Sequence, residues 1–295
     1  MKDSKSEPVI GSRGRPIRAS LLPNLFRCPR FYMEKVLGDK DDVAGEAAQT
    51  GNLVHVGIQT FHQSNGNEAQ ARAMVEASSK VYVSGDVTEA LRLLQKYCKR
   101  ETSERRGIVS RSEEKIEVTL PPSPFDPTKE EIVIQGTVDQ IRTIGRDTIY
   151  VVDHKTGRKP GADMVMEHAT QLAVYMLGVK RMYPDKTVQG FITRIQDLCR
   201  ADLPYWWPMP FGGTEVEIFN VLQPIIDRIA VIRMQRHHST PGKHCEWCPL
   251  SQYPSCITLP LGHRSKTGSQ QIADKVAEKL KPKGKISMSQ LFGGK

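Results

Sequence analysis

Two carboxylates and an amine lie on apolar segments of this sequence. The segment 149–157 reads IYVVDHKTG, in which Asp153 and Lys155 follow a run typical of a buried strand. The two residues share a face of that strand with Val151, because side chains alternate along a strand. An earlier apolar segment, EIVIQGTVDQIRT at 131–143, carries Asp139. Charges beside a buried strand need compensation, because an unpaired charge is costly to remove from water.

The two segments predict a β-hairpin that turns at residues 145–147, Gly-Arg-Asp. Asp139 and Asp153 each lie seven residues from the centre of this turn. A symmetric register makes them cross-strand neighbours, with Cβ atoms about 4.5–5.5 Å apart, and pairs Ile141 with Val151. A divalent cation would relieve the repulsion of the two carboxylates, and hard oxygen ligands favour Mg²⁺ or Mn²⁺. A surface salt bridge at a strand end is the alternative.

Other side chains could complete such a site. Lys155 can reach toward the same ion or toward a phosphate. Gln171 and Tyr175, in QLAVY, lie four residues apart on a predicted helix, so they share a face and could hold a phosphate or a base. His55, in GNLVHVGIQ, lies on a mostly apolar predicted helix, where a neutral imidazole could join the metal ligands. A buried structural histidine and a helix face with one polar residue are the ordinary alternatives.

The elements that must position these residues form a helical part, a group of strands, a helix and another strand. Period-3.6 patterns predict helices, and period-two patterns predict strands. The expected helices are 20–37, 43–63, 87–105, 163–182 and 214–236, and the expected strands are 113–120, 131–143, 147–156 and 187–195. This order predicts an α/β fold with added elements.

Taken together, these residues resemble the RecB-like branch of the PD-(D/E)XK nuclease superfamily. The signature of that branch is a histidine on an N-terminal helix, followed by G-x-x-D, D-x-K-T-G and Q-x-x-x-Y. In this chain these motifs are Gly51–His55, GTVD ending at Asp139, DHKTG from Asp153, and Gln171–Tyr175. The resemblance covers residues 20–257 approximately. It implies a restriction-endonuclease-like core, a central mixed sheet flanked by helices, with an N-terminal helical part and a C-terminal cysteine cluster.

The resemblance also implies roles for the side chains. It implies that one or two divalent ions, Mg²⁺ or Mn²⁺, are bound by His55, Asp139, Asp153 and the backbone carbonyl of His154. Lys155 would orient or stabilise the attacking hydroxide, so that the catalytic residues are Asp139, Asp153 and Lys155, while Gln171 and Tyr175 would contact DNA. The predicted function is a metal-dependent DNA exonuclease that acts on single-stranded DNA or duplex ends, in replication, recombination or repair.

A second candidate centre is a group of cysteines. HCEWCPLSQYPSC places Cys245, Cys248 and Cys256 within twelve residues, Cys28 in FRCPRFY is a candidate fourth ligand, and His244 keeps a Cys₃His zinc site open. Four thiolates could hold Zn²⁺ or an iron–sulfur cluster. The arrangement resembles the iron–sulfur staple of AddB-type and CRISPR-adaptation exonucleases. That resemblance implies a structural 4Fe–4S cluster that ties the start of the fold to its end, with Zn²⁺ as the alternative.

The charge of the chain lies at its two ends. The net charge is +9; residues 1–30 carry seven basic against two acidic side chains, and residues 264–295 carry eight against two. Basic ends favour a polyanionic partner such as DNA, although solvated tails would have the same composition. We expect a flexible basic N-terminus at 1–18, a nuclease domain at 19–262 with a helical insertion at 41–106, and a flexible basic tail at 263–295.

The remaining expectations concern partners and location. The tail contains MSQLF, which loosely resembles sliding-clamp-binding peptides, so a sliding clamp or a helicase is a candidate partner. Residues 205–207, Tyr-Trp-Trp, could stack on unpaired bases or pack as an aromatic plug. The sequence shows no bilayer-spanning run and no signal peptide, so we expect no membrane contact and a cytoplasmic location, the host cytoplasm for a viral protein. A catalytically silent DNA-binding accessory module and a zinc-stapled structure-specific endonuclease are the alternative functions.

Overall fold

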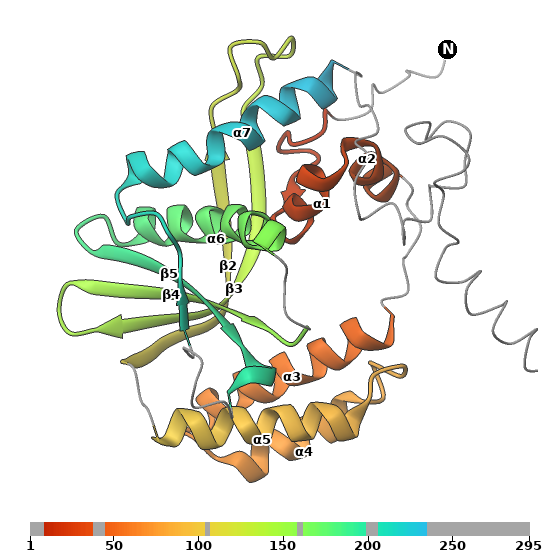
Figure 1. The fold of residues 1–295 in the computed structure, drawn as a ribbon, viewed down its shortest axis with the longest axis vertical. Coiled ribbons are helices and arrows are strands. Elements are labelled where there is room, and N and C mark those ends of the chain that lie inside the picture. Colours follow the sequence, from red (N-terminus) through yellow and green to blue (C-terminus); the bar gives the residue numbers. More distant parts are fainter. Residues whose placement is uncertain (1–8, 38–44, 104–106, 158–161, 199–205, 235–295) are drawn as a thin grey trace, which may run out of the picture.

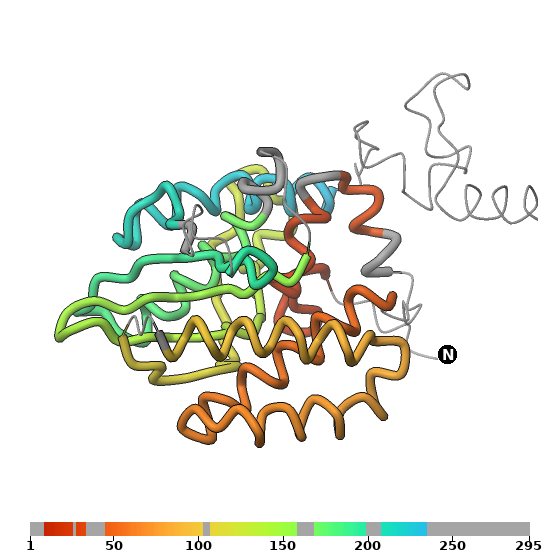
Figure 2. The backbone as a smooth tube through the Cα atoms, turned by 60° about the horizontal axis from the view of Figure 1, so that its bottom comes forward, coloured from red at the N-terminus to blue at the C-terminus, as the bar shows by residue number. Residues whose placement is uncertain are grey.

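A mixed β-sheet lies between two layers of helices (Figures 1 and 2). The computed structural model describes residues 9–37, 45–103, 107–157, 162–198 and 206–234. Within this part the sheet has six strands: β1 (Ile17–Arg18), β2 (Ile108–Leu120), β3 (Ile132–Ile144), β4 (Thr148–Lys155), β5 (Thr187–Arg194) and β6 (Trp206–Pro208). The helices are α1 (Leu22–Arg27), α2 (Pro29–Leu37), α3 (Glu46–Gln63), α4 (Glu68–Ser78), α5 (Val87–Ser103), α6 (Ala162–Met182) and α7 (Glu215–Arg233).

The sheet combines an antiparallel meander with a parallel crossover. Strands β2, β3 and β4 pair antiparallel, and the register of β3 with β4 is the predicted one, with Ile141 opposite Val151. Helix α6 then leads to β5, which pairs parallel with β4, and β6 pairs antiparallel with β5. The short β1 pairs parallel with β3. These pairings confirm the predicted fold class, a mixed sheet flanked by helices.

Each face of the sheet carries its own apolar core. One core joins the sheet to α1, α6 and α7, and includes Val151 and Leu172. The other joins α3, α4 and α5 to the opposite face, through residues such as Leu94 and Val152. In Figure 2 the layer of α4 and α5 lies below the strands and α7 above them. A strand between two apolar layers can carry a charged side chain only where the charge is paired or where the sheet opens, which restricts where a polar site can form.

The structure differs from the sequence prediction at several elements. The expected helix at 20–37 is divided at Cys28, which is extended (φ −158°, ψ 111°), because the residue before a proline disfavours the helical conformation and Pro29 begins the next helix. Helix α4 was not predicted; its sequence, EAQARAMVEAS, buries only Ala71 and Val75. The predicted strands extend as expected, but β2 begins at Ile108, five residues before the predicted start.

The N-terminal segment is packed where it is described. Residues 9–18 were expected to be flexible, but Ile17 is buried and pairs with Ile134. Gly11 accepts a hydrogen bond from the backbone of Val133, and the Arg233 guanidinium donates to the carbonyl of Ile10. The segment therefore belongs to the folded body. No helix in the described ranges combines the length and the apolar composition that crossing a lipid bilayer requires.

Candidate active site

The strands that carry the two aspartates separate at the site. The ladder of β3 with β4 continues as far as Gln140 and Val152, and Asp139 and Asp153 follow directly after this last pair. Beyond it, the backbone N–H of His154 donates to the Asp139 carboxylate, with 2.5 Å between N and Oδ2. A side-chain acceptor has therefore replaced the backbone acceptor that a continued ladder would offer.

Strand β3 changes its neighbour at the same place. Strand β2 lies along one edge of β3, opposite residues 132–143. On the other edge β1 pairs with Ile134 and Gln135, whereas β4 pairs with residues 140–144. Residues 136–139 lie between these two partners, so the sheet opens at Asp139. The opening gives a carboxylate on a central strand access to a cleft.

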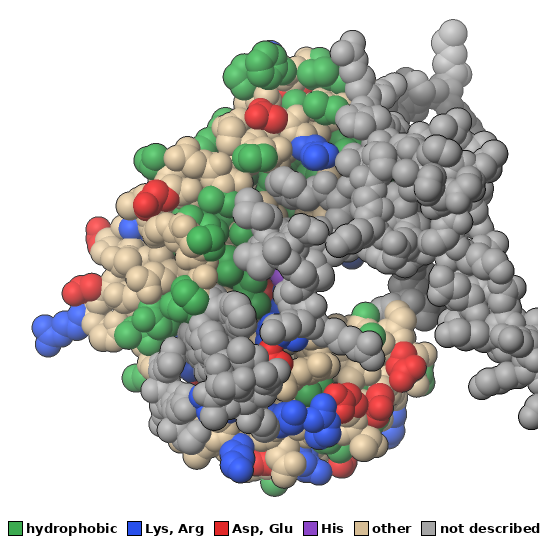
Figure 3. Space-filling model, viewed as in Figure 1, with side chains coloured by type: hydrophobic (Ala, Val, Ile, Leu, Met, Phe, Trp, Pro, Cys, Tyr) green, Lys and Arg blue, Asp and Glu red, His purple; other side chains and the backbone are tan. Residues whose placement is uncertain are grey.

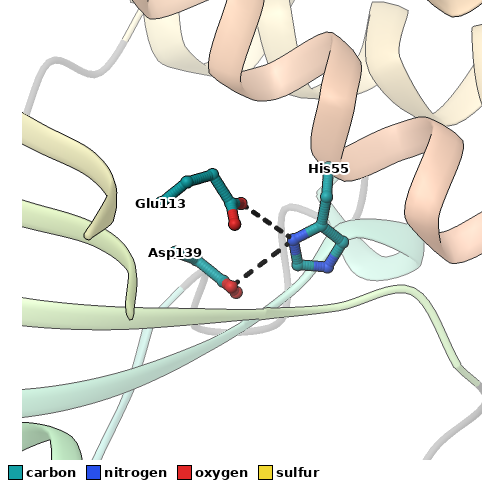
Figure 4. Close-up of side chains that lie close together, drawn as sticks. All are labelled: His55, Glu113 and Asp139. Carbon is teal, nitrogen blue, oxygen red and sulfur yellow. Dashed lines mark ion pairs between the residues drawn. The ribbon is translucent and has the colours of Figure 1, made fainter. Parts of the chain in front are cut away.

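A histidine and two carboxylates converge at this opening (Figure 4). His55 reaches down from α3, Asp139 lies on β3 and Glu113 lies on β2. His55 Nδ1 is 3.5 Å from Asp139 Oδ1 and 3.7 Å from Glu113 Oε1. One ligand atom from each residue lies within 4.8 Å of the other two. Nitrogen and oxygen donors at these separations could hold a divalent cation.

Glu113 was not predicted from the sequence. It lies on β2 between the pairs Ser112–Gln140 and Glu114–Val138, which places it opposite Asp139. Its backbone has a positive φ of 53°, an uncommon conformation for a residue other than glycine. The loop between β2 and β3 is long, so the sequence does not predict the register of these two strands. The only sign of Glu113 in the sequence was an acidic residue within an alternating strand.

The other predicted residues form a second group beside the first. Lys155 Nζ lies 2.8 Å from Asp153 Oδ2 and 3.2 Å from Gln171 Oε1. The Gln171 amide also donates to Tyr175 Oη, at 2.8 Å. Gln171 and Tyr175 are buried but line the same cleft as His55. The structure thus places these two helix residues against Asp153 and Lys155.

Two glycines in the motifs permit this convergence. A Cβ atom on Gly136 would lie 2.6 Å from the ring of Tyr175 and 3.0 Å from the Ala19 side chain. A Cβ atom on Gly51 would lie 2.9 Å from Thr156 Oγ1. The distances to Tyr175 and to Thr156 are too short for a carbon atom, and the distance to Ala19 is tight. Glycine therefore lets α6 lie against β3, and α3 lie against the end of β4.

The charges at the site are out of balance. Burial of His55 alone would lower the pKa of its imidazole, but Asp139 and Glu113 outweigh burial and raise this pKa to about 10. Burial tends to raise the pKa of Asp139, yet the charge and hydrogen bond of His55 hold it below the usual range. Burial raises the pKa of Asp153, opposed by Lys155 and reinforced by Asp139. Three carboxylates thus face two cations, and a bound cation would correct the excess of negative charge.

These groups line one cleft of about 1330 Å³. Its walls are α3, the polar faces of β2 and β3, and the end of β4 with Thr156 and Gly157, and Tyr82 also lines it. In the space-filling view, Lys, Arg, Asp and Glu side chains lie side by side on the lower helical layer (Figure 3). The cleft is therefore lined by charged groups that could interact with a charged ligand.

A separate polar cluster lies behind the site, against α5. The Arg142 side chain is fully buried and binds both carboxylate oxygens of Glu101, at 2.8 and 2.9 Å. Tyr97 Oη and Gln140 Oε1 accept further hydrogen bonds from the same guanidinium. The buried His154 ring packs edge-on against Tyr97, with centroids 5.3 Å apart. This cluster joins α5 to β3 and β4, and of its members only His154 also lines the cleft.

Some predicted residues remain untested. The role of the His154 carbonyl as a ligand stays a prediction. Cys28 is buried beside Phe31, and it forms no disulfide within the part of the chain that the structure describes. The predicted ligands Cys245, Cys248 and Cys256, together with Tyr205 and the basic tail, lie outside the described residues.

Comparisons with known proteins show which family and which solved structures the chain is similar to. A family model described as the PD-(D/E)XK nuclease superfamily matches residues 19–253. No curated protein matches the chain. Among solved structures, a candidate exonuclease from Eubacterium rectale is 14% identical, with a TM-score of 0.49 over 83% of this chain and 90% of that one. A second, SSO0001, is 16% identical, with a TM-score of 0.34 over 71% of this chain and 86% of that one.

Proposed function

The chain belongs to the PD-(D/E)XK nuclease superfamily, and from this membership we propose that it is a metal-dependent DNA exonuclease that hydrolyses phosphodiester bonds in single strands or at duplex ends. One observation carries the proposal. His55, Glu113 and Asp139 converge in the same cleft as Asp153 and Lys155, although they come from four separate elements.

The residues at the opening of the sheet fit a hard divalent cation. Two carboxylates and an imidazole are donors that Mg²⁺ or Mn²⁺ accepts, Mn²⁺ more readily than Mg²⁺ where nitrogen is included. His55, Glu113 and Asp139 would hold the ion, with Asp153 close by on the neighbouring strand. Such an ion, when bound, activates water as a nucleophile and neutralises charge that develops on the phosphate.

The side chains around that site prepare it for a phosphodiester. The Lys155 ammonium is held by Asp153 and Gln171, so it can donate to a phosphate oxygen or to the attacking water. Tyr175 orients the Gln171 amide, because it accepts the amide N–H and leaves the carbonyl oxygen for Lys155. Gln171 and Tyr175 thus position Lys155, in addition to any contact with DNA.

The shape of the cleft favours an unpaired strand. Helix α3 covers one side of the site and the sheet covers the other. The Asp139 and Asp153 side chains are only 11% and 5% exposed. A single strand can bend its backbone into a recessed site, whereas a rigid duplex holds its phosphates on the outside of a wide helix. This supports single-stranded DNA, or a frayed duplex end, as the substrate.

The proposal is tested by cleavage of DNA labelled at either end, single- and double-stranded, with Mg²⁺, with Mn²⁺ and with a chelator. We expect the wild-type protein to cleave only with metal. Asp153→Asn should lose about a hundredfold or more of the rate, the scale for removing one electrostatic group from an active site, and should still bind DNA.

The matched control is Asp147→Asn, which changes an aspartate whose side chain is 89% exposed at the β3–β4 turn. This variant should cleave like the wild type. Equal cleavage by Asp153→Asn, or cleavage in the presence of the chelator, would contradict the assignment. DNA binding without cleavage by the wild type would indicate an accessory module instead.

We also propose the cysteine-ligated 4Fe–4S cluster, with Zn²⁺ as the alternative. Cys28 is buried where α1 meets α2, and the family match begins before it and extends past Cys248. Iron, zinc and visible absorbance should be measured on protein purified without oxygen. Loss of the bound metal in Cys28→Ala would support the proposal, and a fully metal-loaded variant would contradict it.

A further inference from the structure

Three rows of side chains cross the polar face of the sheet and line the cleft. Within each row the residues are neighbours on paired strands. Successive rows lie two residues apart along β3, so they share a face at intervals of about 6.6–6.8 Å. The first row is the metal site, with Glu113 and Asp139; the second has Lys115 and Thr137; the third has Glu117, Gln135 and, on β1, Arg18.

Each row beyond the metal site contributes an exposed cation. Lys115 and Arg18 have no hydrogen-bond or ion-pair partner among the residues that the structure describes. The acidic residue in the third row is already engaged, because Glu117 accepts a hydrogen bond from Gln135 at 2.9 Å and lies 3.8 Å from the Arg13 guanidinium. The two free cations thus lie in the cleft without a described anion to neutralise them.

We propose that these rows are a phosphate track for one nucleic-acid strand, in which Lys115 binds the phosphate next to the scissile one and Arg18 binds the phosphate beyond it. The row spacing suits one nucleotide of an extended strand per row. Thr137, between the two cations, adds a hydroxyl donor. This inference rests on the proposed function, since the scissile phosphate defines the first position of the track.

The positions of Lys115 and Arg18 also predict on which side of the cleaved bond the phosphates are bound. Both cations lie on the same side of the metal site, along β3 from Asp139 toward Gln135. An extended strand in the cleft would therefore have its phosphates recognised on one side of the cleaved bond. Solvated surface cations, the ordinary alternative, would show no such one-sided dependence, because general attraction to DNA does not depend on the position of a single phosphate.

The first experiment measures the affinity of the full-length protein for a fluorescent single-stranded oligonucleotide over a range of salt concentrations. Lys115→Ala and Arg18→Ala should each weaken binding about fivefold, the scale of one exposed ion pair. Each should also reduce the slope of log affinity against log salt by about 0.7, the value for one lost contact to a single strand. Lys115→Arg should restore most of the affinity.

The matched control is Arg146→Ala at the exposed β3–β4 turn, which lies outside the cleft. It should leave the affinity and the salt slope unchanged. Equal effects of Arg146→Ala and Lys115→Ala would overturn the track, because they would show attraction by net charge alone. Thermal unfolding of each variant checks that the fold is retained, and both substituted side chains are exposed.

The second experiment replaces single phosphates with neutral methylphosphonates on either side of the cleaved bond. Neutralising the adjacent phosphate on one side should raise the KM of the wild type, and should have no further effect in Lys115→Ala. The phosphate beyond it should show the same coupling to Arg18→Ala. The assignment would be overturned if the effects of the methylphosphonate and of the substitution were additive. It would also be overturned if methylphosphonates on the two sides of the bond had equal effects.

The two proposals fail in different ways. A wild-type protein that does not cleave DNA, but whose strand binding weakens in Lys115→Ala and not in Arg146→Ala, would refute the exonuclease and retain the track. If the wild type cleaves DNA and both Lys115→Ala and Arg18→Ala bind and cleave it equally well, the exonuclease is retained and the track is refuted.

Discussion

Two groups of charges on strand β3 have opposite characters. Arg142 lies against α5, fully buried, with a bidentate ion pair to Glu101 and further hydrogen bonds to Tyr97 and Gln140. Asp139, three residues earlier, faces a cleft with Glu113, and His55 lies between the two carboxylates. The first group satisfies its own charges. The second has more anions than cations.

The difference separates a structural cluster from a functional site. A buried ion pair with all its hydrogen bonds made has nothing left to bind, and it fixes α5 against the sheet. An open group of carboxylates is stabilised by whatever positive charge is present. In the metal-free protein that charge includes a proton on His55, whose pKa the two carboxylates raise to about 10. The proton on His55 thus supplies the positive charge that a bound metal ion would otherwise supply.

The largest expected effect separates activity from stability. Asp139→Asn should lower the rate of DNA cleavage by about a thousandfold, the upper end for removing one charged group from an active site. It should lower the free energy of unfolding without metal only modestly, because the lost attraction between Asp139 and His55 is offset in part by the relief of repulsion between Asp139 and Asp153. Cleavage rates and urea unfolding without metal check this. A large loss of stability would show that Asp139 has a structural role like that of Arg142.

The converse substitution tests the buried cluster. Arg142→Met should destabilise the protein by about 3–5 kcal/mol, because it leaves the Glu101 charge buried and unpaired. The double variant Arg142→Met/Glu101→Met should recover much of this loss, since both charges are then replaced by apolar groups. Urea unfolding of both proteins measures the difference. A double variant no more stable than the single one would contradict a self-contained ion pair.

A comparison of two adjacent glutamates sharpens the definition of the metal site. Glu113→Gln should weaken Mn²⁺ binding by at least about tenfold, the lower range for residues that support a bound metal. Glu114→Gln should leave Mn²⁺ binding unchanged, because Glu114 pairs with Arg111 at 2.6 Å. Isothermal titration with Mn²⁺ distinguishes the two variants. Equal affinities would remove Glu113 from the proposed ligands.

The smallest expected effect is a dependence of stability on pH. The folded-state pKa of His55 is raised above its usual 6.5 to about 10, so its contribution to stability is complete below pH 6.5 and is lost as the pH rises toward 10. Mn²⁺ must displace that proton, so Mn²⁺ affinity should increase over the same range, by at most about tenfold per pH unit. Thermal unfolding with and without Mn²⁺ from pH 6.5 to 9 measures both. A metal-induced rise in Tm that is independent of pH would contradict this.

His154 should show the opposite dependence. Burial outweighs the attraction of Asp139 and lowers its pKa to about 3. The unfolded chain therefore binds a proton that the folded protein does not, and stability should fall as the pH decreases from 6.5 toward 3. His154→Gln should reduce this loss relative to the wild type, although the acidic residues also titrate there. If His154→Gln does not change the loss of stability below pH 6.5, the His154 imidazole would be in contact with water and its pKa would not be lowered by burial.

Local patterns in the sequence predicted most of the fold and part of the site. The alternating segments and the short turn at 145–147 determine the register of β3 and β4, so the sequence alone places Asp139 and Asp153 together. The four-residue spacing of Gln171 and Tyr175 correctly put both on one helix face, and they share a hydrogen bond. Such relations depend on the fixed periods of strands and helices, which the sequence displays directly.

Other features arose only from tertiary structure. Glu113 reaches the site through a pairing across a long loop, with a backbone conformation that no sequence pattern indicates. Gly136 and Gly51 became interpretable only once Tyr175 and Thr156 were found against them. The amino-acid order by itself thus determined the residue types, the strand hairpin and the family signature. Packing of α3 and β2 against the open edge of β3 decided which charges meet, because contacts between distant segments depend on how whole elements fit together.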